Sequence, residues 1–211
     1  MKTSVNNRRR GFTLIEMVGV LAVIAILAAL LIPKIFAAIN ESRLNNAVTS
    51  YNSVKSAAMM YFGKYGVFGS VGGTPYAVSA GTPAATNWDA TVLLPEGLVE
   101  KPFLTKVGTN NFVEVIGCQN AGFTVTGIDD GSFALAGGTT NTAGSGSCVV
   151  EAVFQGVASD DALQLAQRID GPNAIFANGT GTNSTTHLSG RVKYDFAGAN
   201  MGNVYVYIAH K

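Results

Sequence analysis

Charged residues are scarce in this chain: Asp, Glu, Lys and Arg make up 13% of its 211 residues, whereas hydrophobic residues make up 47%. So few charges do not suit an intrinsically disordered chain and favour contact with a membrane or with other subunits. The length suits one ordinary domain with an additional segment.

A net positive charge is also missing from most of the chain. Four of the 14 basic residues lie within the first ten positions, and the rest of the sequence carries ten basic and thirteen acidic residues. A nucleic-acid-binding protein needs a basic surface, and the body of this chain has a formal charge of −3. We therefore expect no nucleic-acid binding.

Patterns of catalytic and metal-binding residues are lacking as well. The sequence has no G-x-S-x-G, H-E-x-x-H or P-loop motif, and its two histidines, His187 and His210, are not at metal-ligand spacing. Asp129-Asp130-Gly131 is a fragment of a calcium loop, for which a turn is the simpler interpretation. The sequence predicts no enzyme activity, no metal site and no cofactor.

A long apolar run is present near the start. The run from Phe12 to Pro33 has 22 residues, of which Glu16 alone is charged. As a helix this run would be about 33 Å long, enough to cross a hydrocarbon core of about 30 Å. The arginines before it predict a cytoplasmic N-terminus, with the rest of the chain outside.

A cleaved secretory signal peptide is the alternative interpretation of this run. It requires an A-x-A cleavage site, and no two alanines in the first 62 residues have that spacing. The apolar run is also longer than the apolar region of most signal peptides. A membrane-spanning helix is therefore favoured.

The residues Gly11-Phe12-Thr13-Leu14-Ile15-Glu16 resemble the processing site of type IV prepilins and of type II secretion pseudopilins. In those families a short basic leader ends in Gly, an aromatic residue follows, and Glu is the fifth residue of the mature chain. Pro33 matches the region in which the family's helix bends. The resemblance covers residues 1–66. Ala25 departs from it, since many relatives have a glycine there that loosens the helix.

The resemblance implies processing and assembly. A prepilin peptidase would remove the leader, residues 1–11, by cutting after Gly11, and would methylate the new amine of Phe12. Glu16, with Thr13 beside it, would act in assembly by compensating that amine on a neighbouring subunit. The alternative for Glu16 is a carboxylate that reaches the membrane edge.

The resemblance also implies partners: other copies of the chain, the prepilin peptidase, the pilus assembly machinery of the inner membrane, and lipid before assembly. The chain would first sit in the bacterial inner membrane, with a single pass, and then in a cell-surface pilus.

The helical pattern continues through residues 34–63, where apolar residues recur every three or four positions and polar residues lie between them. This amphipathic half should pack on a globular domain, and Gly63 and Gly66 should end it. Pro33 should kink the helix where the two halves meet.

The remainder, residues 64–211, is predicted to be a globular domain with Gly-, Ser- and Thr-rich loops. A loop is expected over residues 67–87, a short turn or helix over 88–98, and a helix that begins at Ser159 with carboxylates in its first turn. Predicted strands cover residues 112–116, 122–126, 132–135, 148–154, 191–196 and 203–209. The last alternates as a half-buried antiparallel strand does. The fold class is α+β, with a long N-terminal helix on an antiparallel sheet, as in pilins.

The two cysteines, Cys118 and Cys148, lie on the outward side of the predicted topology. An even pair in an oxidising compartment predicts a disulfide, and two buried thiols are the alternative.

Three functions remain after these exclusions. The first is a structural subunit of a type IV pilus, and the alternative is a pseudopilin of a type II secretion system. The pilus is favoured by the larger domain and the predicted disulfide. The third function, a membrane-tethered enzyme or receptor domain, requires a catalytic constellation that the sequence lacks.

Overall fold

The computed structural model describes residues 11–118, 128–135, 142, 147–171, 186–196 and 199–211. The chain forms two compact units that divide between Ser42 and Arg43. Helix α1 (Leu14–Tyr65) contributes to both units.

The first unit consists of the apolar part of α1. Its leucines, its alanines and Met17 are strong helix formers, and nearly all of its side chains are exposed. Pro33 lies inside the helix, which continues on both sides of it. Because proline has no N–H, one backbone hydrogen bond is missing at this point.

The second unit contains the amphipathic end of α1. Its buried side chains are spaced by three or four residues, which places them on one face: Leu44, Ala47, Tyr51, Val54, Ala57, Ala58 and Tyr61. The helix ends at Tyr65, and Gly66 follows with a positive φ of 69°. The Gly66 N–H donates to the Phe62 carbonyl oxygen at 2.7 Å, so the predicted stop at Gly66 is confirmed. The predicted stop at Gly63 is wrong, because α1 continues through that residue to Tyr65.

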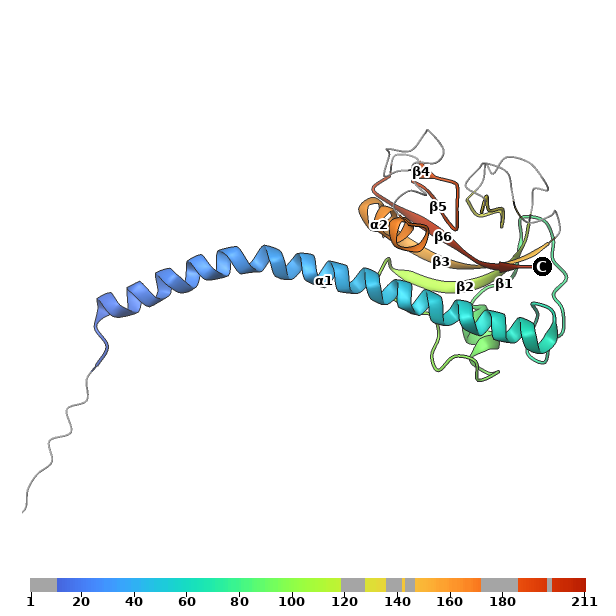
Figure 1. Ribbon diagram of the computed structural model, residues 1–211, viewed down its shortest axis with the longest axis horizontal. Helices are drawn as coiled ribbons and strands as arrows, with labels where there is room; N and C mark the ends of the chain where they lie inside the picture. The colour runs from blue at the N-terminus through green and yellow to red at the C-terminus, as the bar shows by residue number, and fades with distance from the viewer. Residues whose placement is uncertain (1–10, 119–127, 136–141, 143–146, 172–185, 197–198) are drawn as a thin grey trace, which may run out of the picture. The chain divides into compact units, whose positions relative to one another are not determined.

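Six antiparallel strands form one sheet in the described part of the second unit (Figure 1), in the order β1-β2-β3-β6-β5-β4. They are β1 (Pro83–Ala85), β2 (Asn110–Gly117), β3 (Cys148–Ala158), β4 (Thr186–His187), β5 (Val192–Asp195) and β6 (Met201–His210). A helical turn, η1 (Asp89–Leu93), precedes β2, and helix α2 (Ser159–Ile169) follows β3. This arrangement confirms the predicted α+β fold with a long N-terminal helix.

Four predicted strands are confirmed as β2, β3, β5 and β6, and the predicted helix at Ser159 is confirmed as α2. The strand predicted over residues 132–135 is wrong, because Gly131 (φ 67°) and a turn at Asp130 remove the segment from the sheet. The strand predicted over 122–126 lies outside the described residues. Short strands β1 and β4 were not predicted, since two or three residues carry no periodicity.

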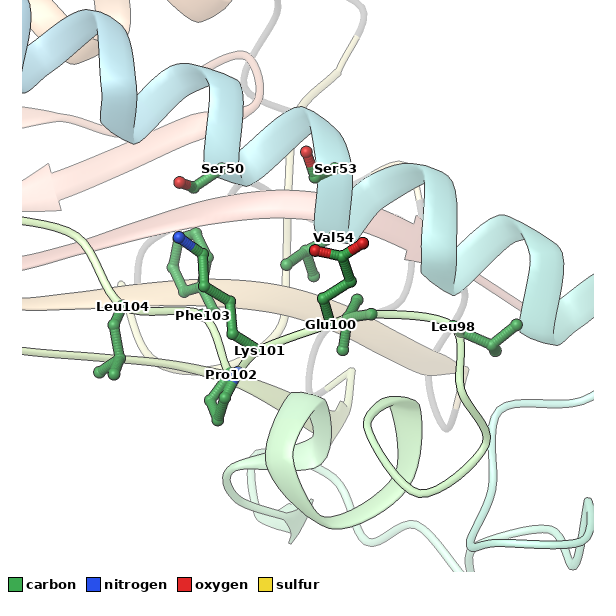
Figure 2. Close-up of a pocket in the computed structure, with 10 residues that line it drawn as sticks. Ser50, Ser53, Val54, Leu98, Glu100, Lys101, Pro102, Phe103 and Leu104 are labelled. Carbon is green, nitrogen blue, oxygen red and sulfur yellow. The ribbon is translucent and has the colours of Figure 1, made fainter.

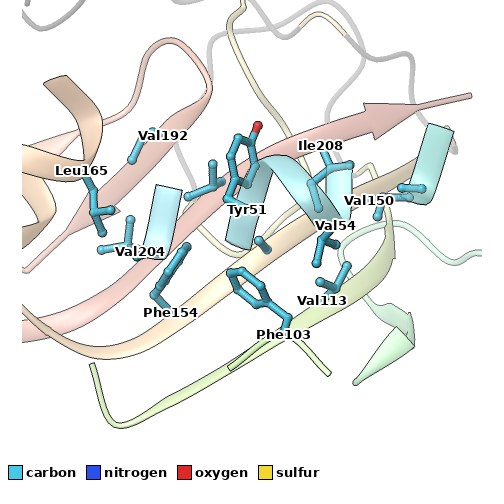
Figure 3. Packing of buried hydrophobic residues seen from close by; sticks show 14 of the residues in the cluster. Tyr51, Val54, Phe103, Val113, Val150, Phe154, Leu165, Val192, Val204 and Ile208 are labelled. Atoms are coloured by element: carbon cyan, nitrogen blue, oxygen red, sulfur yellow. The ribbon is translucent and has the colours of Figure 1, made fainter. Parts of the chain in front are cut away.

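The main core lies between α1 and one face of the sheet (Figure 3). Tyr51 and Val54 of α1 lie against valines of the central strands, and the Tyr51 hydroxyl donates to the Tyr207 carbonyl oxygen at 2.5 Å. Leu165 brings α2 into the same core. Together these contacts hold the end of α1 on the sheet.

The other face of the sheet carries a second, smaller core. It includes Ile116, Val149 and Val153, and Phe133 packs over it from the segment 128–135. Tyr205 of β6 is also buried on this face. The prediction that β6 is half-buried is therefore wrong, because the chain covers both of its faces.

Two glutamates lie directly opposite each other on this second face. Glu114 of β2 pairs with Glu151 of β3, and both side chains are buried. Burial raises the pKa of Glu114; the interaction with Glu151 opposes this rise and the Asp129 carboxylate adds to it. Burial also raises the pKa of Glu151 well above the usual range; the Lys193 ammonium opposes this rise and Glu114 adds to it. The folded chain therefore keeps protons that the unfolded chain releases.

The free energy of unfolding should accordingly fall as pH rises from 5 to 8. A carboxyl pKa raised by folding stabilises the folded state below the unfolded pKa, and this contribution is lost as pH rises through the folded pKa. Glu114→Gln should raise the free energy of unfolding at pH 8 and flatten its pH profile, because it removes one of the two raised carboxyl pKa values. Denaturant titrations of the detergent-solubilised chain at several pH values measure both effects. An unchanged slope in Glu114→Gln would contradict this assignment.

Candidate assembly site

The N-terminal end of α1 is closed by reciprocal hydrogen bonds between Thr13 and Glu16. The Glu16 N–H donates to Thr13 Oγ1 at 3.3 Å. In return, the Thr13 N–H and Oγ1 donate to Glu16 Oε2 at 2.8 and 2.7 Å. Thr13 precedes the first helical residue and Glu16 is the third, so the pair forms a capping box.

The capping box is a role of Glu16 that the sequence analysis missed. Its signal, Thr-x-x-Glu before an apolar run, is present in the sequence as Thr13-Leu14-Ile15-Glu16. The carboxylate also lies in the first turn, where the helix dipole favours a negative charge. Glu16 therefore stabilises the start of the helix, and its carboxylate is held beside Thr13, the residue after Phe12.

Gly11 and Phe12 precede the capping box and are both exposed. A Cβ at Gly11 would have no described atom within 4 Å, and its φ is not in the left-handed region. Neither packing nor backbone conformation therefore requires glycine at this position. Phe12 is 79% exposed.

Beyond the capping box, α1 presents a long apolar surface. Large side chains from Leu14 to Ile39 are about half exposed or more. By length and composition α1 could cross a membrane, although the core helix of a soluble protein or a signal sequence can satisfy the same criterion. So large an exposed apolar surface indicates a lipid or protein partner.

The predicted disulfide between Cys118 and Cys148 is not formed. Gly117, not Cys118, lies opposite Cys148, and the Cys118 N–H donates to the Ser147 carbonyl oxygen at 2.8 Å. Because successive residues of a strand point to opposite faces, Cys118 packs in the second core and Cys148 against the main core. Thiols on opposite faces of a sheet cannot be bridged without backbone movement.

Both thiols should therefore react with an alkylating reagent after unfolding, without any reductant. In the folded chain they should react slowly at pH 8, because Cys118 is buried and burial raises the pKa of the Cys148 thiol to about 11. Peptide mass spectrometry of folded and unfolded samples measures the difference. A peptide containing Cys118 linked to Cys148 would refute the assignment.

Asp130, from the fragment of a calcium loop, and two further aspartates have structural partners. Asp130 accepts hydrogen bonds from Ser132 and lies 3.2 Å from the Lys193 ammonium. Asp161 forms an ion pair with Arg43, which ties α2 to α1. Asp170 accepts the N–H groups of Arg191 and Val192 at 2.8 and 3.0 Å. Within the described part of the chain no group of His, Cys, Asp and Glu could hold a metal ion.

The two histidines also make structural contacts. His187 Nδ1 lies 2.8 Å from the Val192 carbonyl oxygen, and His210 Nδ1 lies 2.5 Å from the Tyr207 hydroxyl. They lie on β4 and at the end of β6, and each contacts a neighbour close by in the sequence. The structure gives no sign that they act together.

A surface pocket of about 290 Å³ lies between α1 and the loop 98–104 (Figure 2). Ser50, Ser53 and Val54 line it from the helix, and Glu100 and Lys101 are its charged residues. The Ser53 hydroxyl donates to the Thr49 carbonyl oxygen at 3.1 Å. Since the lining contains no histidine or cysteine, it offers no familiar pair of nucleophile and base.

A family model described as the prokaryotic N-terminal methylation motif matches residues 6–32. The match begins in the basic leader, includes Gly11, Phe12 and Glu16, and ends just before Pro33. This chain carries a prepilin-type methylation motif. The motif is characteristic of type IV pilins and pseudopilins, so the suspected resemblance is confirmed.

Pilin-type proteins are structural subunits, and the motif together with the apolar helix indicates association with a membrane. Neither the curated proteins nor the solved structures gave a significant match. The motif covers 27 residues.

Proposed function

We propose that this chain is the structural subunit of a type IV pilus, cut after Gly11, methylated at Phe12 and assembled through its N-terminal helix. The observation that carries the proposal is the methylation motif at the start of an exposed apolar helix. The motif supplies the processing site, and the helix supplies an apolar surface that must be covered by lipid or by other subunits.

Processing is supported by the surroundings of Gly11. The fold does not require glycine at this position. Recognition by a peptidase that cuts between the leader and Phe12 would explain why Gly11 is there. Phe12 would become a charged N-terminal amine, and Thr13 would still cap α1. The Glu16 carboxylate, already bonded to the Thr13 N–H, is held one residue from that amine.

The partners follow from the same features. Before assembly the apolar helix would lie in the inner membrane with its N-terminus in the cytoplasm, within reach of a prepilin peptidase and of the pilus assembly machinery. In the filament it would pack against copies of itself. The globular unit, Arg43–Lys211, would then form the outer surface, where a pilus serves adhesion or motility.

Isolation of surface filaments from cells that express the chain tests the proposal. The subunit should begin at N-methylated Phe12 by mass spectrometry, and filaments should disappear when the gene is deleted. If the processed chain stays in the inner membrane and deletion blocks protein secretion instead, the pseudopilin alternative is correct. An assembled subunit that retains Met1 would overturn both interpretations.

A further inference from the structure

A lysine is completely buried on the second face of the sheet. The side chain of Lys193 in β5 has no exposed surface, and its Nζ lies 3.2 Å from Oδ1 of Asp130, whose side chain is 6% exposed. The ammonium also lies 4.4 Å from the centre of the Phe133 ring. A buried ion pair of this kind is costly to desolvate, and the fold holds the two groups in contact despite that cost.

A third ionisable group belongs to the same cluster. Glu151 of β3 is fully buried and lies opposite Glu114, whose carboxyl group interacts with it. The strand register places Glu151 opposite Tyr207, and Lys193 opposite Tyr205 two residues earlier, so both lie on the same face. Glu151 interacts electrostatically with Lys193 and with Asp130, whereas Lys193 is not among the groups that shift the pKa of Glu114.

We propose that Lys193 and Asp130 condense to an amide cross-link in the folded chain, with Glu151 carrying the proton. The product would join β5 covalently to the segment 128–135, across 63 residues of sequence. Such a cross-link would hold this segment on the sheet under load, which goes beyond the subunit role proposed above.

The condensation is balanced and needs no added reagent. One proton passes from the Lys193 ammonium to the Asp130 carboxylate, which gives an amine and a carboxylic acid. The amine nitrogen attacks Cγ, and the new C–N bond places negative charge on Oδ1. One carboxyl oxygen of Glu151 accepts a proton from the nitrogen, and the other carboxyl oxygen of Glu151 donates its proton to Oδ2. The Cγ–Oδ2 bond then breaks, and Oδ2 leaves as water.

The surroundings of Asp130 favour this reaction. The N–H and hydroxyl of Ser132 both donate to Oδ1, at 3.0 and 2.5 Å, where the negative charge develops. The two reactants are held together by the fold, which replaces a bimolecular encounter with an intramolecular one. Burial raises the pKa of Glu151 well above its usual range, so it can hold the proton that it must give.

Peptide mapping of the full chain, purified from membranes and digested after denaturation, tests the proposal. We expect one peptide pair joined through residues 130 and 193, lighter by one water molecule than the two separate peptides. An amine-reactive reagent should label the other lysines of the denatured chain and leave Lys193 unlabelled. Separate peptides with a labelled Lys193 would overturn the cross-link.

Asp130 precedes Gly131, and a cyclic imide at Asp130 would also remove one water molecule. Lys193→Arg separates the two products because it keeps the positive charge but cannot form the amide; a mass deficit that persists in this variant would overturn the proposal. Glu151→Gln should lose the cross-link, whereas the matched variant Glu114→Gln should keep it. Equal cross-linking in both variants would show that Glu151 does not carry the proton. If Glu151→Gln fails to fold, a cross-link found in the wild type still supports the proposed bond.

Discussion

Filaments are expected to be lost in Glu16→Ala, while membrane insertion and cleavage after Gly11 continue. The substitution leaves Gly11 and the basic leader in place, so the peptidase site remains. Each subunit in the filament would then bury a positive amine without a compensating charge. Removing one partner of a buried ion pair typically costs about 3–5 kcal/mol. This cost would be repeated at every joint between subunits.

The capping box makes a sharper design possible, because Glu16 has a local structural role as well as a charge. Glu16→Gln keeps a residue that can cap the helix but removes the charge. Thr13→Ala keeps the charge but removes the cap, at a cost of about 1 kcal/mol of helix stability. If charge compensation is what assembly requires, Glu16→Gln should give few or no filaments and Thr13→Ala should give many.

Surface filament yield, measured beside the amount of processed subunit in the membrane, distinguishes these outcomes. Thr13→Ser serves as the control, because serine can make the same cap. Normal filament yield in Glu16→Ala would mean that the carboxylate only reaches the membrane edge. Loss of filaments in Thr13→Ala but not in Glu16→Gln would assign the role of Glu16 to capping alone.

The globular unit should be severely destabilised by Asp89→Ala. Asp89, the first residue of η1, is 2% exposed and accepts two backbone hydrogen bonds. The Phe103 N–H donates to Oδ2 at 2.7 Å, and the Val113 N–H donates to Oδ1 at 3.0 Å. Alanine would leave both buried N–H groups without a partner, at about 1–3 kcal/mol each. That loss is a large fraction of the total stability of an ordinary domain.

Asp89→Asn should be nearly as harmful, since its amide has one oxygen and its NH2 group would face the second N–H donor. Asp129→Asn is the matched control, because Asp129 is exposed and should change the free energy of unfolding by less than about 0.5 kcal/mol. Denaturant unfolding of the detergent-solubilised chain measures all three variants. Equal stability of Asp89→Ala and the wild type would show that the two N–H groups find other partners.

The sequence by itself determined the features that depend on neighbouring residues. The apolar run and the three-to-four spacing after it predict α1, and Gly66 marks its end, because a helix is specified by residues within a few turns of each other. Strands β2, β3 and β6 follow from runs rich in β-branched and aromatic residues. The methylation motif is likewise a local pattern, as is the capping box formed by Thr13 and Glu16.

Only the tertiary structure decided which side chains meet across the sheet. The register between β2 and β3 places Cys118 and Cys148 on opposite faces of the sheet. The number and spacing of the cysteines in the sequence do not determine that register. The segment 128–135 covers the second face of the sheet, and Glu151 and Lys193 are therefore buried. Their strand sequences alone do not say which face of the sheet each side chain is on. Asp89 finds its two donors 14 and 24 residues away. These contacts depend on how distant segments pack, because burial and strand register are set by the whole fold and not by any short run of residues.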